Sequence, residues 1–213
     1  MDKNQMAVAV FDKYASEYQD KFMALPNYED TFDLFCNNIP QTNARIFEIA
    51  CGPGNITRYL LNKRPDFQLL GIDLAPAMVE LAKANNPEAE FRCMDCRKID
   101  TIREKYDGIL CGFALPYLDK EEAAQLIRNA ATLLHPKGIL YLSTMENDYS
   151  TSGLKTSSKG DSVYMYYYKA TDLIGMLEEN GFTALHEIRK DYPETDGSVT
   201  VDLVVVARKG DLN

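Results

Sequence analysis

Two closely spaced glycines at the end of an apolar segment constrain the fold of this chain more than any other feature. Residues 46–49 (Ile-Phe-Glu-Ile) lead into residues 50–54 (Ala-Cys-Gly-Pro-Gly), and a helix-forming segment follows. Gly52 and Gly54 can adopt torsions that a side chain forbids, and a helix N-terminus offers unpaired N–H groups. Asp73 ends the next apolar segment, about 20 residues after the turn, where a doubly wound sheet places its ribose-binding acid. The pattern predicts a nucleotide-type pocket.

Apolar segments alternate with helix-forming segments along the whole chain, which indicates a parallel sheet covered on both faces. Strands are expected at 44–49, 67–73, 90–94, 106–113, 139–144, 183–189 and 199–208. Helix-start signals lie between them: Asn55 as an N-cap, Pro76 in a first turn and Asp119 before two glutamates. Ligands of such sheets bind beyond the carboxyl ends of the strands. We therefore expect Gly52, Asp73, Asp95 and Phe113 to converge there.

The length and composition agree with a single α/β domain. A chain of 213 residues, 46% of them hydrophobic, can bury a real core and lies within the roughly 100 to 250 residues of one domain. A formal net charge of −9 disfavours nucleic-acid binding, because that binding needs clustered Lys and Arg. We find no secretion signal and no membrane-spanning run, and five scattered cysteines suit a reducing compartment. We expect a cytoplasmic protein without membrane or nucleic-acid partners.

The charge around the glycine turn favours a ligand without phosphates. A dinucleotide fingerprint needs a third glycine, and Thr57 stands at that position. Glu48 ends the strand before the turn, and its carboxylate would repel a diphosphate. The same carboxylate suits the ammonium and sulfonium groups of S-adenosylmethionine, whose ribose diol still needs Asp73. A nicotinamide oxidoreductase is therefore a weaker interpretation of this turn.

Three motifs in this order resemble the class I S-adenosylmethionine-dependent methyltransferases, especially the small single-domain kind. They are residues 48–54 (Glu-Ile-Ala-Cys-Gly-Pro-Gly), Asp73 after Gly71, and residues 94–96 (Met-Asp-Cys) after the third strand. The resemblance covers residues 11–209. It implies an α/β fold with a doubly wound, mostly parallel seven-stranded sheet of order 3-2-1-4-5-7-6, the last strand antiparallel and helices on both faces. We expect a Rossmann-like domain over 41–213, preceded by an N-terminal helical lid over 1–40.

The expected cofactor is S-adenosylmethionine, and its chemistry suggests a role for each residue near the strand ends. The backbone of Ala50, Gly52 and Gly54 would pack against the methionine part, and Glu48 would orient the loop or reach the ammonium through water. Asp73 should accept both ribose hydroxyls, although it could instead cap the helix before Pro76. The remaining expected contacts are Leu74 and Met78 on either side of the adenine, and, from the resemblance, Asp95 at the exocyclic amine and the Cys96 N–H at a ring nitrogen. Asp95 could instead cap a turn.

The acceptor side carries fewer signals. Residues 113–118 (Phe-Ala-Leu-Pro-Tyr-Leu) follow the fourth strand, where the family lines its methyl-transfer site. The family pattern for planar nitrogens, [ND]-P-P-[YF], is incomplete because Ala114 replaces its first residue. We expect catalysis mainly by positioning, with Tyr117 contacting the acceptor as the catalytic residue and Phe113 beside the cofactor. His135 and His186 lie away from this place.

Aromatic residues near the N-terminus could close the pocket. Phe11, Tyr14, Tyr18 and Phe22 share one face if the segment is a single helix, which either packs on the sheet or forms a lid with Tyr14 or Tyr18 near the cofactor. Tyr164, Tyr166 and Tyr168 alternate as on a strand and could cover an acceptor or pair across strands. The polar segment 146–162 between them and the fifth strand reads as a long mobile loop.

The sequence thus predicts an S-adenosylmethionine-dependent methyltransferase with a small-molecule acceptor of unknown identity. A non-catalytic S-adenosylmethionine-binding module is the alternative, because no general base is evident. The Cys93-x-x-Cys96 pair could be a redox or metal motif, but no second pair completes a metal site. Thiol-assisted transfer through Cys51, Cys96 and Cys111 is a minor hypothesis.

Overall fold

A computed structural model describes residues 3–157, 159–194 and 197–211, and its centre is one seven-stranded sheet. The strands of this sheet are β1 Arg45–Ile49, β2 Gln68–Asp73, β3 Glu90–Cys93, β4 Tyr106–Cys111, β5 Leu134–Met145, β8 Phe182–Pro193 and β9 Val199–Lys209. Their order is β3-β2-β1-β4-β5-β9-β8, and β9 is antiparallel to both of its neighbours. Counted among these seven strands alone, the order is 3-2-1-4-5-7-6. The predicted fold class and topology are confirmed.

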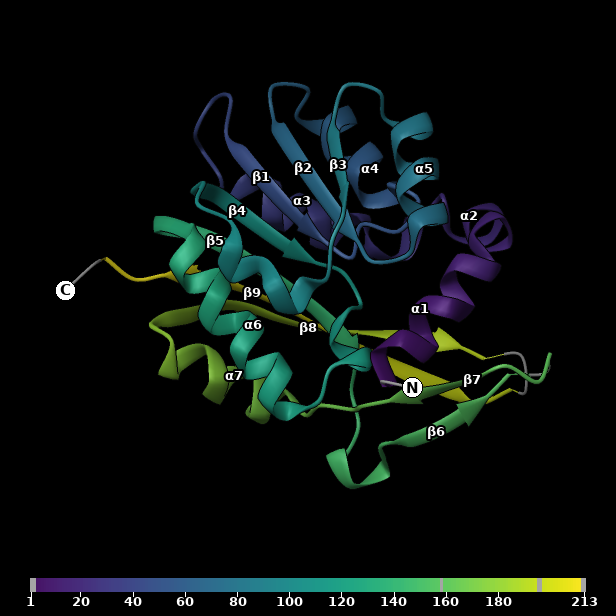
Figure 1. Cartoon of the computed structure of the whole chain (residues 1–213). Coiled ribbons are helices and arrows are strands. Elements are labelled where there is room, and N and C mark those ends of the chain that lie inside the picture. The colour runs from purple at the N-terminus through teal and green to yellow at the C-terminus, as the bar shows by residue number, and fades with distance from the viewer. Residues whose placement is uncertain (1–2, 158, 195–196, 212–213) are drawn as a thin grey trace.

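Helices cover both faces of the sheet (Figure 1). They are α1 Lys3–Lys13, α2 Ala15–Phe22, α3 Glu29–Asn37, α4 Asn55–Lys63, α5 Pro76–Asn85, α6 Lys120–Leu133 and α7 Ala170–Glu179. Apolar side chains of α3 and α4 pack with one face, and those of α6 and α7 pack with the other. No helix within the described ranges is long and apolar enough to cross a membrane.

The first helix of the nucleotide-type unit starts differently from the prediction. Gly54, in the left-handed region at φ 77°, precedes α4, and Asn55 is the first helical residue rather than the N-cap. A Cβ at Gly54 would lie 2.3 Å from Asn86 Nδ2 and 3.2 Å from the Ala82 backbone. Glycine is therefore required by close packing against α5 as well as by its torsion. Asn55 instead donates from Nδ2 to the carbonyl oxygen of Phe22 at 2.9 Å.

The other two helix-start signals are confirmed. Pro76 opens α5, where its missing N–H has no partner to lose. Asp119 caps α6 in a capping box, since its side chain accepts from the Glu122 N–H while the Glu122 side chain accepts from the Asp119 N–H.

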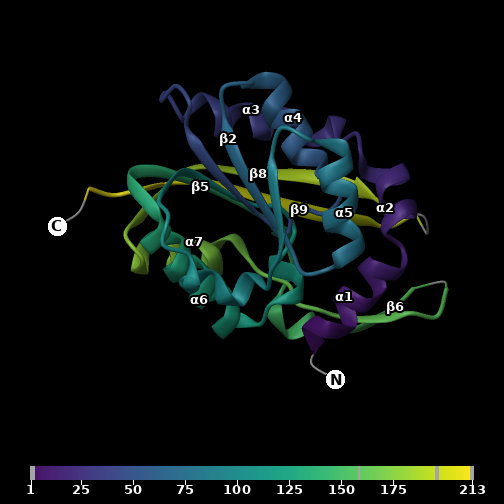
Figure 2. The same ribbon diagram turned by 45° about the horizontal axis from the view of Figure 1, so that its top comes forward.

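The N-terminal segment forms two helices rather than one. Tyr14 separates α1 from α2, because its φ and ψ of −112° and 23° are not helical. A short 3-10 helix, η1 Pro26–Tyr28, then leads into α3. In Figures 1 and 2, α1 and α2 lie beyond the end of the sheet toward which the central strands point. They therefore stand over the edge where a ligand is expected.

The polar segment after β5, which we predicted to be a long mobile loop, contains regular secondary structure. It contains a short 3-10 helix at Tyr149–Thr151 and a hairpin of β6 Gly153–Thr156 and β7 Ser162–Met165. Strand β7 packs against α1, beside the same edge of the sheet (Figure 1). Backbone pairing between β6 and β7 explains why residues of low apolar content are ordered here.

Candidate active site

The glycine turn after β1 is held in a strained backbone conformation. Ala50, Gly52 and Gly54 all have positive φ values, of 56°, 52° and 77°. A positive φ is unusual for alanine and concentrates at functional sites. The Cys51 N–H donates to the Ile72 carbonyl at 2.9 Å, and the Gly54 N–H donates to the Cys51 carbonyl at 3.0 Å. The turn is thus fixed to the end of β2 before any ligand arrives.

Asp73 joins the turn to the next helix. Its Oδ2 accepts from the Gly52 N–H and its Oδ1 from the Ala75 N–H, both at 2.9 Å. Burial raises the pKa of this carboxyl, and the N–H groups of Ala75 and Gly52 oppose that shift. The alternative of a helix N-cap is wrong, because Ala75 is the N-cap of α5 and no side chain of the described residues caps this helix. A carboxylate has about four lone-pair sites, so both oxygens keep acceptor capacity for ribose hydroxyls.

Glu48 lies below the turn and differs from our expectation. The side chain is 0% exposed, and the Thr57 hydroxyl donates to Oε2. Oε1 has no partner among the described residues. Burial raises the pKa of Glu48 to about 8, because a charge is costly without water. The group is therefore mostly neutral at pH 7 in the protein alone, rather than the negative charge that we predicted.

The segment after β3 is organised by an ion pair. The Arg97 guanidinium binds Asp95 at 2.8 Å and Glu122 at 3.0 Å. Oδ1 of Asp95 also accepts from the Arg97 N–H at 2.9 Å, which confirms the turn-capping role of Asp95. Cys96 follows as the first residue of the short 3-10 helix Cys96–Thr101. Contacts of Asp95 and Cys96 with adenine stay predictions.

Leu74 and Met78 are placed differently from one another. Leu74 is half-buried directly after β2, whereas Met78 is buried and packs with Ala15 and Ala75. Tyr18 and Phe11 of the N-terminal helices also pack against this cluster. In this structure Met78 supports α1 and α2, and the contacts of Leu74 and Met78 with adenine stay predictions.

An aromatic group lies between the N-terminal helices and the segment after β4. The Phe11 ring contacts Tyr18 and Tyr117 edge-on, with centroids 5.8 and 5.2 Å apart. Tyr18 lies over the glycine turn, since its Cε1 would be 3.8 Å from a Cβ at Gly52. Burial is the main cause that raises the pKa of Tyr18 to about 12, and the charge of Asp73 adds to the shift. Burial also raises the pKa of Tyr117, and Tyr18 and Tyr167 add to this. The structure thus brings Tyr18 and Tyr117 together at the predicted edge.

Phe113 marks the start of the acceptor region. Its φ is 53°, its N–H donates to Ser143 Oγ at 3.0 Å, and its ring contacts Tyr28 edge-on at 5.7 Å. Another non-glycine residue with positive φ therefore lies at the edge of the sheet that carries the glycine turn. Phe113 packs against the core that includes α3 rather than against Asp73.

Tyr14 and the alternating tyrosines do not face the glycine turn. The Tyr14 hydroxyl donates to Asp161 at 2.6 Å. Tyr166 stacks on Tyr149 at 5.9 Å and contacts Tyr164 at 4.8 Å, so these rings pack on one another. Tyr167 is the tyrosine of this segment that adds to the raised pKa of Tyr117.

The cysteines do not form a reactive centre. All five are free, and the described residues contain no cluster able to hold a metal ion. Burial raises the pKa of the Cys111 thiol to about 12 and raises those of Cys51 and Cys96 as well. Because the thiolate is the reactive form, the structure disfavours thiol-assisted transfer.

A methyltransferase domain model matches residues 46–138, which run from β1 to the first part of β5. This span contains the glycine turn, Asp73, Asp95 and Tyr117. Residues 46–138 thus carry a methyltransferase domain, in agreement with the family that the motifs resemble. This match agrees with the predicted cofactor, S-adenosylmethionine.

Relatives and solved structures agree with this family. A putative methyltransferase of Invertebrate iridescent virus 6 is 27% identical over 52% of this chain, which spans only 39% of that relative's length. A carboxy-S-adenosyl-L-methionine synthase of Campylobacter jejuni is 28% identical over 84% of this chain and 88% of its own length. The 1,6-didemethyltoxoflavin-N1-methyltransferase of Burkholderia thailandensis, solved with 1,6-didemethyltoxoflavin and S-adenosylhomocysteine, has a TM-score of 0.72 at 18% identity. The match covers 97% of this chain and 88% of that chain.

The sequence analysis did not identify three polar residues that lie next to the site. Ser143 holds the Phe113 N–H, and Tyr28 contacts the Phe113 ring. Asp202 accepts from the Tyr28 hydroxyl at 2.5 Å. One signal was available, because Asp202 is a single acid within the apolar segment 199–206.

Replacing Glu48 with Gln should change how the stability of the methyltransferase depends on pH. The folded pKa of about 8 lies above the ordinary 4.5, so the unfolded chain binds fewer protons between these values. Glu48 therefore lowers the free energy of unfolding of the protein as the pH rises from about 4.5 to about 8, by up to about 1.4 kcal/mol per pH unit. Urea unfolding should show Glu48→Gln gaining stability over wild type at pH 8 and much less at pH 5.

The exposed Glu178→Gln change is the control and should follow wild type at both pH values. Equal pH dependence of Glu48→Gln and wild type would contradict the assignment of a neutral, buried Glu48.

Proposed function

We propose that this methyltransferase transfers a methyl group from S-adenosylmethionine to a small-molecule acceptor. One observation carries the proposal: the glycine turn with Asp73 and the segment with Tyr117 lie at one edge of the sheet, under the same aromatic cover of Phe11 and Tyr18. The structural neighbour from Burkholderia thailandensis is a 1,6-didemethyltoxoflavin-N1-methyltransferase, which supports a small-molecule acceptor.

The residues at the turn fit the cofactor. Gly52 has open space on its outer side, with Tyr18 as the nearest described atom group to an added Cβ. Asp73 keeps acceptor capacity for the ribose hydroxyls. The unpartnered Oε1 of Glu48 can receive a water or an ammonium N–H through the turn. When bound, S-adenosylmethionine supplies an electrophilic methyl group on a sulfonium.

The chain's own residues act mainly by positioning and by excluding water. Tyr117, with its ring against Phe11, orients the acceptor beside the turn. Phe11 and Tyr18 close the site from α1 and α2, and a dry site strengthens the interactions of the groups inside it. Holding two reactants in register can contribute roughly 7 to 11 kcal/mol, enough for this to be the main source of catalysis.

The lid is made of two parts that contact each other. Lys13 and Tyr14, at the junction of α1 and α2, both bind Asp161 beside β7, at 3.0 and 2.6 Å. Lys159 lies over the Tyr14 ring at 4.3 Å and near Glu17 at 3.4 Å. We assign Tyr14 to this contact rather than to the cofactor. The N-terminal segment 1–40 and the β6–β7 hairpin then open and close together.

Ligand-dependent thermal stability tests the proposed function. S-adenosylhomocysteine at 100 times its dissociation constant should add about 2.7 kcal/mol of stability, while NAD should leave the melting temperature unchanged. S-adenosylmethionine with a library of small acceptors should then yield S-adenosylhomocysteine. Stabilisation without product from any acceptor would favour the non-catalytic binding module, and stabilisation by NAD alone would contradict the proposal.

Replacing Asp161 with Asn should open the lid. Exposed ion pairs contribute about 0.2 to 1 kcal/mol, so trypsin should cleave after Lys155 and Lys159 about two to five times faster in Asp161→Asn. S-adenosylhomocysteine should slow the cleavage in both proteins, because it favours the closed lid. Gel densitometry of timed digests measures both effects.

Asp33→Asn is a matched control, because Asp33 also accepts from a tyrosine and a lysine, Tyr59 and Lys63, but lies on α3. It should digest like wild type in the hairpin. If Asp161→Asn and Asp33→Asn digest alike, the hairpin contact does not hold the lid.

A further inference from the structure

Asp202 is a buried carboxyl group with an incomplete set of hydrogen bonds. Its side chain lies on β9 and is 3% exposed. Oδ2 accepts from the Tyr28 hydroxyl at 2.5 Å, whereas Oδ1 has no partner among the described residues. A buried carboxylate oxygen without a donor costs several kcal/mol in stability. Such a group needs an explanation in function or in a bound partner.

The strand register places Asp202 beside the acceptor region. Asp202 pairs with Met145, and Val204 pairs with Ser143, on adjacent β9 and β5. Val204 belongs to the core on the α3 face, and side chains alternate along a strand, so Asp202 faces the same side. Its partner Met145 lies two residues closer to the carboxyl end of β5 than Ser143, the residue that holds Phe113.

Tyr28 connects Asp202 to the acceptor region. Its hydroxyl binds Asp202 and its ring packs edge-on against Phe113. Phe113 opens the segment that ends in Tyr117. The carboxyl group, the tyrosine and the strained Phe113 thus form one continuous set of contacts behind the acceptor position.

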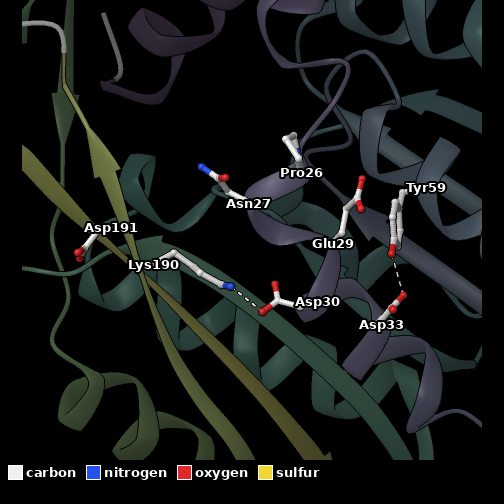
Figure 3. A pocket seen from close by; sticks show the side chains of 8 residues that line it. All are labelled: Pro26, Asn27, Glu29, Asp30, Asp33, Tyr59, Lys190 and Asp191. Carbon is white, nitrogen blue, oxygen red and sulfur yellow. Dashed lines mark hydrogen bonds and ion pairs between the residues drawn. The ribbon is translucent and has the colours of Figure 1, made fainter.

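An open hollow of about 590 Å³ adjoins this set (Figure 3). Pro26, Asn27 and Glu29 line it on either side of Tyr28, and Lys190, which pairs with Asp202 across the strands, lines the opposite wall. The remaining lining residues are Asp30, Asp33, Tyr59 and Asp191. The hollow thus lies beside the chain neighbours of Tyr28 and the strand neighbour of Asp202, and most of its charged groups are acidic.

The charge of this region selects against anionic acceptors. Lys190 is the one cation among the lining residues, and its Nζ is held by Asp30 at 2.5 Å. An acceptor carboxylate or phosphate would meet Asp202, Asp191 and Glu29 with no free cation from the lining. A positively charged donor would instead satisfy Oδ1 and the acidic surroundings together.

We propose that Asp202, oriented by Tyr28, binds the amino group of a small-molecule amine acceptor through Oδ1 and accepts a proton from it. This inference rests on the proposed methyl transfer and names its acceptor class. Tyr28 acts as a positioning residue, since it fixes the carboxyl group through Oδ2.

The reaction balances without a further reagent. The acceptor ammonium gives one proton to the Asp202 carboxylate and becomes a neutral amine. The nitrogen lone pair then forms the new bond to the methyl carbon, and the electron pair of the carbon–sulfur bond stays on sulfur. The methylated ammonium and a neutral thioether are the products, and Asp202 returns its proton to water when the product leaves.

The titration of Asp202 agrees with this role. Burial raises its pKa to about 6, although the Tyr28 hydroxyl opposes the shift and Glu194 adds to it. A carboxylate with this pKa accepts a proton readily near neutral pH. The other titratable groups around the pair are Tyr141 on β5, Lys190 and Tyr192 on β8, and Asp30 on α3.

Matched probes and variants test the inference. Full-length protein with S-adenosylmethionine is assayed for S-adenosylhomocysteine with benzylamine, benzyl alcohol and benzoate, and with a library of primary and secondary amines. Amines should give product, and benzoate should not. In Asp202→Asn, kcat/KM for the best amine should fall at least 100-fold, and its rise with pH through about 6 should disappear. Tyr28→Phe should lower it less and retain the rise.

Asp107→Asn is the control, because Asp107 is also a strand aspartate with a hydrogen bond, to the Arg45 N–H, but lies at the opposite edge. It should keep wild-type kinetics. The affinity for S-adenosylhomocysteine, measured by calorimetry, should stay within twofold in all variants. Three results, each with intact cofactor binding, would overturn the amine assignment. They are product from alcohols or carboxylates alone, no product from any amine, and unchanged kinetics in Asp202→Asn. Absence of cofactor binding in wild type overturns the proposed function itself.

Discussion

The hydrogen bonds of Asp73 to the Gly52 and Ala75 N–H groups are the interaction on which the active site depends. The turn after β1 has three positive-φ residues, and no β-ladder can hold such a backbone. Asp73 ties it to the start of α5, and Gly54 lets the Asn86 side chain approach on the other side. The position of the turn relative to β2 is therefore fixed in the folded chain. A cofactor would meet a preformed site instead of ordering a loop.

The buried carboxyl groups have different surroundings, and these suggest different tasks. Asp73 accepts two backbone N–H groups and faces the edge of the sheet. Glu48 has one hydroxyl donor and is mostly neutral in the protein alone. Asp202 has one tyrosine donor and a free oxygen near the acceptor region. On this account the protein keeps two underpartnered acids where a cationic cofactor and a cationic acceptor would each supply a donor.

The sheet and its order could be predicted because apolar segments and glycine turns are local signals that resemble a known family. The same was true of Asp119 and Pro76, whose effects lie within one helix turn. The break at Tyr14 was missed because helical spacing continues across it. The β6–β7 hairpin was missed because polar strands lack alternation. Asp202 and Tyr28 could not be paired from sequence, since they lie 174 residues apart and meet only when β9 returns beside β5.

The most direct test of the central claim is calorimetric titration of S-adenosylhomocysteine into Asp73→Asn, with exposed Asp100→Asn as the control. Asparagine retains one acceptor oxygen but presents an amide to a backbone N–H. The account predicts at least tenfold weaker binding to Asp73→Asn, about 1.4 kcal/mol or more, together with a lower melting temperature. It predicts wild-type binding to Asp100→Asn. Wild-type affinity and melting temperature in Asp73→Asn would contradict it.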